Sequence, residues 1–238
     1  MKTVAVIPVH GRHELVKHTI ERLLKKNGCM AVICAGITEL ERAVCEKSGA
    51  IFIEHENLPL SNKWNACFLE AKKLNPDAVL FMGSSDWISD NWITYCSQWI
   101  DRADLIGHRG FHLLDIGQQF RACYWDGYGP GRREKEPIGI GRILSARILD
   151  KLEWKPIDEG LNNSIDWSMY QNVLKSGGKV QCLEGQKIKS LSISCDKWPN
   201  MHKFEDHWNN VLPSVRNFDH AFLINNFPEA YEIFKNEN

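Results

Sequence analysis

Short apolar runs and amphipathic helical patterns alternate regularly through the first hundred residues of the chain. The stretch at residues 14–26, for example, places Leu15, Ile20 and Leu23 on one side of a helix. Short strands that alternate with helices imply right-handed βαβ units, whose strands run parallel in one sheet. We therefore predict an α/β fold with a mainly parallel central sheet and helices on both of its faces. The expected strands are residues 4–7, 31–34, 50–53 and 78–82, and the expected helices are residues 14–26, 38–47, 61–74 and 90–100.

The pattern changes after residue 103. Residues 105–108, 111–116 and 120–125 are typical of antiparallel strands joined by tight turns, so we expect a small antiparallel insertion. The next segment, residues 126–137, holds three glycines, two prolines and six charged side chains, which indicates a mobile loop. Further helices are expected at residues 145–152, at residues 164–175 and after Pro228, and further strands at residues 179–183 and 188–193.

Charge and cysteine usage narrow the class of protein. The 29 Lys and Arg residues balance 30 Asp and Glu residues, so no overall field attracts nucleic acid or an anionic membrane. The eight cysteines form no CxxC pair, which is typical of reduced intracellular thiols. No apolar run approaches the roughly 18 residues of a membrane span. We therefore expect a cytoplasmic protein without a membrane span.

One carboxylate stands out at the end of an expected buried strand. Residues 81–87, with the sequence FMGSSDW, end an apolar run with small residues followed by Asp86. Open α/β sheets bind ligands at the carboxyl ends of their strands, and divalent cations are held by carboxylates together with substrate phosphates. Asp86 is therefore a candidate metal ligand beside a nucleotide diphosphate. The alternative is that Ser84, Ser85 and Asp86 form a turn that caps a helix after Trp87.

The turn after the first strand disfavours two common nucleotide-binding folds. A dinucleotide-binding domain needs a glycine fingerprint there, whereas this chain has the sequence PVHGR at residues 8–12. The chain also has no Walker loop, and the sequence GIGR at residues 139–142 lies too far downstream to serve as either motif.

The order and spacing of four segments resemble the GT-A glycosyltransferases, specifically the family-2-type nucleotide-sugar enzymes, a fold that bacteriophage transferases also use. These segments are VAVIPVHGR at residues 4–12, LSNKWNA at 60–66, SSD at 84–86 and ID at 165–166. The resemblance covers roughly residues 1–183. It implies a Rossmann-like GT-A catalytic domain at residues 1–195, with a nucleotide-sugar-binding half at 1–103 and an acceptor-side half at 104–195. Residues 196–238 would then be an extension that packs on the active site.

The resemblance also implies roles for individual residues. Asp86 would hold Mn²⁺ or Mg²⁺, with His202 as a further ligand and Asp196 or His207 as its competitors. Asp166 would be the catalytic base of an inverting displacement; the alternative is an acid that favours the first turn of a helix. The expected contacts to the donor are Pro8, His10, Arg12, Lys63, Ser84 and Ser85. For Arg12 and Lys63, the alternative to a donor contact is a place on a solvated helix face.

The chain departs from the family pattern at two places. Only the last carboxylate of the Asp-x-Asp motif is present, so a serine or the backbone would contact the ribose. The sequence Cys34-Ala35-Gly36 replaces the usual acidic residues after the second strand, so recognition of the base would differ or would use Glu54 or His55.

The expected reaction moves a sugar from a nucleoside diphosphate sugar to a hydroxyl of a glycan, lipid-linked sugar, protein or small molecule. A hydroxymethylated DNA base is a further possible acceptor, because six basic residues lie on the expected acceptor side. Two other interpretations are a sugar nucleotidyltransferase and a non-catalytic module that binds sugar nucleotides. Trp87 is expected either to stack on a sugar or to belong to the core. The six basic residues are Arg121, Arg132, Arg133, Lys135, Arg142 and Arg147.

Overall fold

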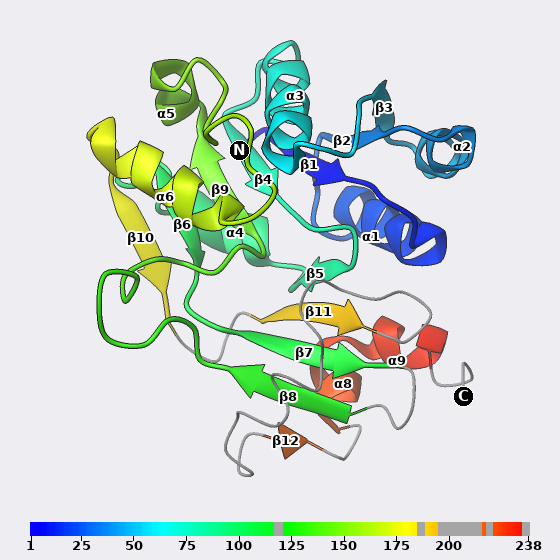
Figure 1. The fold of residues 1–238 in the computed structure, drawn as a ribbon. Helices are drawn as coiled ribbons and strands as arrows, with labels where there is room; N and C mark the ends of the chain where they lie inside the picture. The colour runs from blue at the N-terminus through cyan, green and yellow to red at the C-terminus, as the bar shows by residue number, and fades with distance from the viewer. Residues whose placement is uncertain (117–120, 185–188, 195–215, 218–220, 235–238) are drawn as a thin grey trace.

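The computed structural model describes residues 1–116, 121–184, 189–194, 216–217 and 221–234 of the chain. Its main sheet has seven strands in the order β10-β6-β9-β4-β1-β2-β3 (Figure 1). All neighbouring strands in this sheet are parallel except for β9, which runs antiparallel to both β4 and β6. The strands are β1 (Thr3–Pro8), β2 (Ala31–Gly36), β3 (Ile51–Glu54), β4 (Ala78–Phe81), β6 (Leu105–His108), β9 (Arg142–Ser145) and β10 (Val180–Leu183).

Helices cover both faces of the main sheet. The side chains of β1 alternate between these faces and are buried on both. Ala5 and Ile7 pack in one core with α1 (His13–Lys25), α2 (Glu39–Lys47) and α4 (Trp92–Ser97). Val4 and Val6 point to the other face and pack with α3 (Leu60–Lys72), α5 (Ala146–Lys151) and α6 (Ile165–Lys175). The predicted mainly parallel α/β fold with helices on both faces is therefore confirmed.

A second sheet lies beside the first and has the order β12-β8-β7-β11-β5 (Figure 1). One of its faces packs against the two C-terminal helices, where Leu114, Leu191 and Phe227 share a core with Trp87. Trp87 is therefore a core residue, as one of its two interpretations held. The elements are β5 (Asp86–Ile88), β7 (Phe111–Asp115), β8 (Arg121–Trp125), β11 (Ser190–Ser194), β12 (Arg216–Asn217), α8 (Ala221–Asn226) and α9 (Pro228–Phe234).

The structure differs from the sequence-based expectations at three places. The segment at 105–108 is not part of the antiparallel insertion: it is β6 of the main sheet, parallel to β10. Strand β9 lies between β4 and β6 but was not predicted, because it begins with the charged residue Arg142, which is fully buried. Asp86 caps no helix, because it begins strand β5, and the next helix starts at Trp92.

The C-terminal extension reaches the second sheet in its described part. Helices α8 and α9 pack on β7 and β11 and on Leu15 of α1. Neither helix contributes a described residue to the lining of the cavity beside Asp86, so the prediction that the extension packs on the active site stays a prediction. Within the described ranges, no helix combines the length and the apolar character needed to cross a bilayer.

Candidate active site

A cavity of about 480 Å³ lies where the chain leaves the end of β4 and crosses to the second sheet. Its position at the carboxyl ends of β1 and β4 is the place where open α/β sheets bind ligands. Segments that are far apart in the sequence close it. The residues around it include Pro8, Arg12, Trp64, Phe81, Gly83, Ser84, Ser85, Asp86, Phe111, Leu113, Trp125, Tyr128, Arg133, Gly139, Ile165, Asp166 and Ser192.

Asp86 is held in this cavity by a tight turn. Its Oδ2 accepts a hydrogen bond from the Gly83 N–H at 3.0 Å, and the Ser192 side chain on β11 also hydrogen-bonds to the carboxyl group. A Cβ on residue 83 would lie 2.4 Å from Oδ2, so the turn needs glycine. Burial raises the pKa of Asp86 to about 6, although Ser192, Gly83 and Arg12 act in the opposite direction. The turn therefore fixes a half-buried carboxylate beside the cavity.

Asp166 reaches the same cavity from the first turn of α6. Its carboxylate lies against Gly139, because a Cβ there would be 2.6 Å from Oδ2. Its main-chain oxygen accepts a hydrogen bond from Arg142 Nη1 at 2.6 Å. The charge of Asp166 also raises the pKa of Asp86, which is the effect expected of a second carboxylate nearby. Both predicted carboxylates are thus brought to one cavity.

A buried ion-pair network supports the Asp166 side of the cavity. Arg142 has a fully buried side chain, and its Nη2 lies 2.9 Å from Glu136 Oε1. Arg133 binds the same carboxylate with two nitrogens, at 2.6 and 2.8 Å. The Arg133 guanidinium also lies 3.7 Å from the ring centre of Tyr128. The segment predicted to be a mobile loop is therefore anchored by Glu136, and it presents Tyr128 and Arg133 to the cavity.

Arg12 supplies a second positive charge, on the β1 side of the cavity. Its Nη1 donates to Ser85 Oγ at 3.1 Å, and its charge lowers the pKa of Asp86. Gly11 and Arg12 both have left-handed backbone conformations, with φ of 63° and 53°. Glu41 holds this turn by accepting from the Gly11 N–H at 3.0 Å. The two carboxylates therefore face a cavity with an arginine on either side.

The structure separates the other predicted donor contacts. Pro8, Ser84 and Ser85 line the cavity, but His10 is exposed and does not. Lys63 does not line it either, because its side chain is buried beneath the end of β1. Its Nζ donates to the Val9 carbonyl and, at 2.6 Å, to Asn57 Oδ1. Burial lowers the pKa of Lys63, whereas Glu41 raises it.

Several other nominated residues lie elsewhere. Glu54 pairs with Arg42 at 2.9 Å, and His55 Nδ1 is in hydrogen-bond contact with the Glu56 carbonyl, so neither lines the cavity. The predicted metal ligand His202 and its competitors Asp196 and His207 lie outside the described residues.

The six basic residues of the expected acceptor side do not form one surface. Arg142 is fully buried, Arg121 pairs with Asp115 at 2.8 Å on the second sheet, and Arg147 pairs with Asp104 at 2.7 Å. All six residues are in the described part of the chain, and Arg133 is the one of them that lines the cavity. Arg142 is therefore inaccessible to an acceptor, and Arg121 and Arg147 are each paired with an acid, while a DNA acceptor stays a prediction.

Residues that could hold a cation are few in the described part of the chain. No group of three His, Cys, Asp or Glu side chains gathers there in a geometry that would hold a metal. Asp86 and the hydroxyls of Ser84 and Ser85 offer only oxygen atoms. One carboxylate with substrate phosphates and water is a usual site for Mg²⁺, so these residues fit a cation carried largely by a diphosphate.

Comparison with known proteins bears on the fold. No protein-family model and no curated protein sequence matches the chain. Among solved structures, it is similar to Staphylococcus aureus TarS, a glycosyltransferase, with a TM-score of 0.57 and 14% identity over 82% of this chain and 37% of that one. The fold is of the GT-A type. A second TarS structure, of residues 1–349, gives a TM-score of 0.52 and 13% identity over 81% of this chain.

A nucleotidyltransferase shares the same architecture. The 4-diphosphocytidyl-2C-methyl-D-erythritol synthase of Anaerococcus prevotii gives a TM-score of 0.51 and 12% identity, over 78% of this chain and 90% of that one. The chain spans 37% and 60% of the two TarS chains. Both enzyme classes share the GT-A-type fold, and similarity at these identities shows the fold alone. A choice between the two activities therefore has to be argued from the residues of the cavity.

Proposed function

We propose that this protein is an inverting glycosyltransferase that moves a sugar from a nucleoside diphosphate sugar to an acceptor hydroxyl. The observation that carries the proposal is that Asp86 and Asp166 line one cavity, with Arg12 and Arg133 beside them. The transfer needs charge to balance the departing diphosphate and a base for the acceptor hydroxyl. The two arginines and two carboxylates match these two needs.

Asp166 is the base in this mechanism. As the acceptor oxygen forms its bond to the anomeric carbon, its proton passes to the Asp166 carboxylate, and the bond from that carbon to the diphosphate oxygen breaks. The nucleoside diphosphate leaves with the electron pair of that bond. A single displacement of this kind inverts the anomeric centre. Arg12 and Arg133, which line the same cavity, would stabilise the diphosphate charge.

Asp86 is the residue that would hold Mn²⁺ or Mg²⁺, with oxygens of the donor diphosphate completing most of the coordination. A bound cation would neutralise the charge of the leaving diphosphate. Ser85 accepts a hydrogen bond from Arg12, so it connects the Asp86 turn to the end of β1. We propose that this contact replaces part of the role of the absent first acid of the Asp-x-Asp motif.

A sugar nucleotidyltransferase is the second candidate, because the similarity to the synthase of A. prevotii covers 90% of that chain. Such enzymes normally carry a glycine-rich, basic loop after the first strand. Here that turn is Val9-His10-Gly11-Arg12, with only one cation that lines the cavity. We therefore favour transfer to a hydroxyl, with a glycan or small molecule as the acceptor rather than DNA.

Product analysis by ³¹P NMR separates the two candidates. The protein is incubated with Mn²⁺ and a panel of UDP-, GDP- and TDP-sugars, and separately with nucleoside triphosphates and sugar 1-phosphates. Slow release of a nucleoside diphosphate from one of the sugar nucleotides is expected, and Asp101→Asn, which alters an exposed carboxylate, should not change it. Pyrophosphate release from the second mixture would favour the nucleotidyltransferase. If no sugar nucleotide is turned over and none binds, that result would contradict both candidate functions.

A further inference from the structure

A second cavity, of about 660 Å³, lies between the ends of β6 and β10 and the second sheet. It shares no lining residue with the candidate active site. Successive residues of a strand point to opposite faces, so Phe111 and Leu113 line the active-site cavity while His112 lines the second one. On β8, Trp125 and Tyr124 divide in the same way. The two cavities therefore take different side chains of β7, β8 and β11.

Two buried polar atoms at the second cavity have no protein partner among the described residues. They are Nε2 of His108, a residue that is 5% exposed, and Oγ of Ser190, a residue that is 1% exposed. Buried polar groups of this kind are normally hydrogen-bonded, because leaving one unpaired costs its lost hydration. The His108 ring is fixed, since it stacks on Trp92 with 3.9 Å between ring centres. Both atoms thus need a partner that the described protein does not supply.

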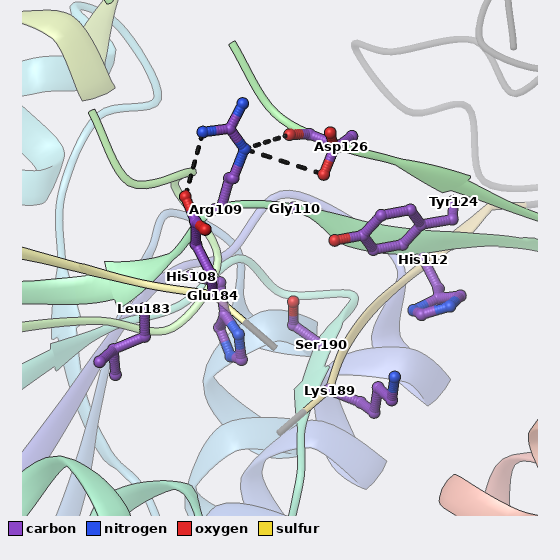
Figure 2. A pocket seen from close by; sticks show the side chains of 10 residues that line it. All are labelled: His108, Arg109, Gly110, His112, Tyr124, Asp126, Leu183, Glu184, Lys189 and Ser190. Carbon is purple, nitrogen blue, oxygen red and sulfur yellow. Dashed lines mark hydrogen bonds and ion pairs between the residues drawn. The ribbon is translucent and has the colours of Figure 1, made fainter. Parts of the chain in front are cut away.

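The phenol of Tyr124 completes the polar lining. Figure 2 shows the hydroxyls of Tyr124 and Ser190 pointing toward the same space. A Cβ on residue 110 would lie 2.5 Å from the Tyr124 hydroxyl oxygen, so glycine at this position makes room for it. The position of the phenol therefore depends on the absence of a side chain next to it.

The charges at this cavity largely compensate each other. Arg109 lies 3.2 Å from a Glu184 carboxylate oxygen and 3.8 Å from an Asp126 one, as the dashed lines in Figure 2 show. Burial lowers the pKa of His108 to about 3, with smaller effects of the same sign from His112 and Lys189, so its ring is neutral at pH 7. The hydroxyls and the neutral imidazole each can donate and accept hydrogen bonds. Such groups suit ligand hydroxyls, which also do both.

We propose that this second cavity binds a saccharide, whose hydroxyls pair with His108, Ser190 and Tyr124. Its volume is within the usual range of small-molecule sites. This site is distinct from the cavity that Asp86 and Asp166 line. The proposal does not depend on which reaction takes place there.

Ligand-observed saturation-transfer NMR with glucose, N-acetylglucosamine, galactose and maltose tests this site. At least one of these sugars should bind saturably to the full chain in the millimolar range. Tyr124→Phe, which removes only the hydroxyl, should weaken binding about three- to tenfold, and Ser190→Ala should weaken it similarly. The matched control is Tyr95→Phe, because Tyr95 lies on α4 and does not line this cavity.

Three results would overturn the proposal. One is that none of the four sugars binds saturably. Another is that Tyr95→Phe weakens binding as much as Tyr124→Phe does. The third is that Asp86→Ala abolishes the binding while Tyr124→Phe and Ser190→Ala leave it unchanged, since the sugar would then occupy the active-site cavity. Thermal unfolding of each variant, followed by circular dichroism, verifies that the variants compared are folded.

Discussion

The carboxylate of Asp166 occupies its place because residue 139 has no side chain. A Cβ on residue 139 would lie 2.6 Å from Oδ2 and 2.8 Å from Oδ1 of Asp166. We predict that Gly139→Ala displaces this carboxylate and lowers kcat for sugar transfer by about 100-fold, because a misplaced base loses its alignment with the acceptor. The KM for the donor should change by less than about twofold, since the three atoms nearest to the added Cβ all belong to Asp166. Initial-rate kinetics measures both quantities.

Gly129→Ala is the matched control for that substitution. Nothing lies within 4 Å of where its Cβ would be, and its backbone φ is not in the left-handed region. It should behave as the wild type does. A Gly139→Ala enzyme with wild-type kcat, or an equal loss in both variants, would show that Asp166 is not the base that this geometry suggests.

Two histidines at the second cavity should make the protein sensitive to acid. Burial lowers the pKa of His108 and of His112 to about 3, whereas an unfolded histidine has a pKa of about 6.5. A depressed pKa means that the unfolded state binds more protons, so this stabilisation is complete above about pH 6.5 and is lost as the pH falls. Between pH 7 and pH 5 we expect the free energy of unfolding to drop by about 2 kcal/mol for each histidine.

His108→Phe isolates one of these contributions, because phenylalanine can keep the ring stacked on Trp92. The drop in the free energy of unfolding between pH 7 and pH 5 should be about 2 kcal/mol smaller in this variant than in the wild type. Urea denaturation at the two pH values gives the comparison. An identical drop in both proteins would mean that His108 is already protonated in the fold at pH 5.

The two carboxylates were predictable from the sequence, but the residues that hold them were not. Asp86 was nominated by its place after a strand and Asp166 by the resemblance to the GT-A glycosyltransferases, and both line the cavity. Lys63 was assigned to the donor, yet its side chain is buried against Val9 and Asn57, and sequence alone does not distinguish a buried lysine from an exposed one. Gly139 gave no signal, because its closeness to Asp166 exists only in the fold.

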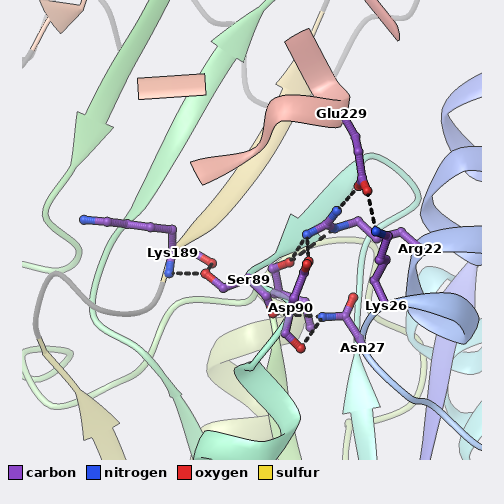
Figure 3. Close-up of polar contacts among 8 residues, drawn as sticks. Arg22, Lys26, Asn27, Ser89, Asp90, Lys189 and Glu229 are labelled. Carbon is purple, nitrogen blue, oxygen red and sulfur yellow. Dashed lines mark hydrogen bonds and ion pairs between the residues drawn. The ribbon is translucent and has the colours of Figure 1, made fainter. Parts of the chain in front are cut away.

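At the scale of elements, α9 is attached through Arg22 to α1, a helix that packs on the main sheet. Figure 3 shows the Arg22 guanidinium between the carboxylates of Asp90 and Glu229, and its Nη2 also donates to the Ile88 carbonyl at 3.2 Å. Arg22 is 7% exposed and its guanidinium carbon lies 5.2 Å from the Trp87 ring centre. The contact therefore connects α9 to β5, the strand that begins at Asp86.

Breaking this contact should destabilise the whole protein. We predict that Arg22→Met lowers the free energy of unfolding by about 3 kcal/mol, because it removes a buried guanidinium and leaves the Ile88 carbonyl without this donor. Glu229→Gln should lower it by about 1 kcal/mol, because Glu229 is partly solvated and the contact is screened. Glu159→Gln, which breaks the exposed pair with Lys155 at 2.8 Å, should cost less than about 0.5 kcal/mol. Urea denaturation measures all three. Equal losses in the three variants would contradict a structural role for Arg22.

Elements were predictable where their hydrophobic pattern was local. Strands β1, β2 and β4 and helices α1, α2 and α6 have apolar periods that fit a buried sheet and its covering helices. Strand β9 was missed because Arg142 makes it look polar, and the partner that neutralises it, Glu136, comes from the preceding loop. Strand β5 is only three residues long and pairs with β11, about a hundred residues away in the chain, so it has no local signal.

At the scale of the whole molecule, the fold and the chemistry are different levels of evidence. The GT-A-type fold is shared by glycosyltransferases and nucleotidyltransferases. The placement of Asp86 and Asp166 around one cavity is an observation beyond the fold, and the proposed division of labour between the two carboxylates rests on it. That division is the central claim, and it can be tested on the intact chain.

The most direct test combines calorimetric titration of the active nucleotide sugar with the release of nucleoside diphosphate, using Asp86→Ala, Asp166→Asn and the control Asp101→Asn. We predict that Asp86→Ala abolishes donor binding that depends on Mn²⁺. Asp166→Asn should leave the donor Kd within about threefold of the wild type, yet lower transfer to the acceptor by at least about 100-fold. Normal transfer by Asp166→Asn, or unchanged Mn²⁺-dependent donor binding by Asp86→Ala, would contradict the assignment of these roles.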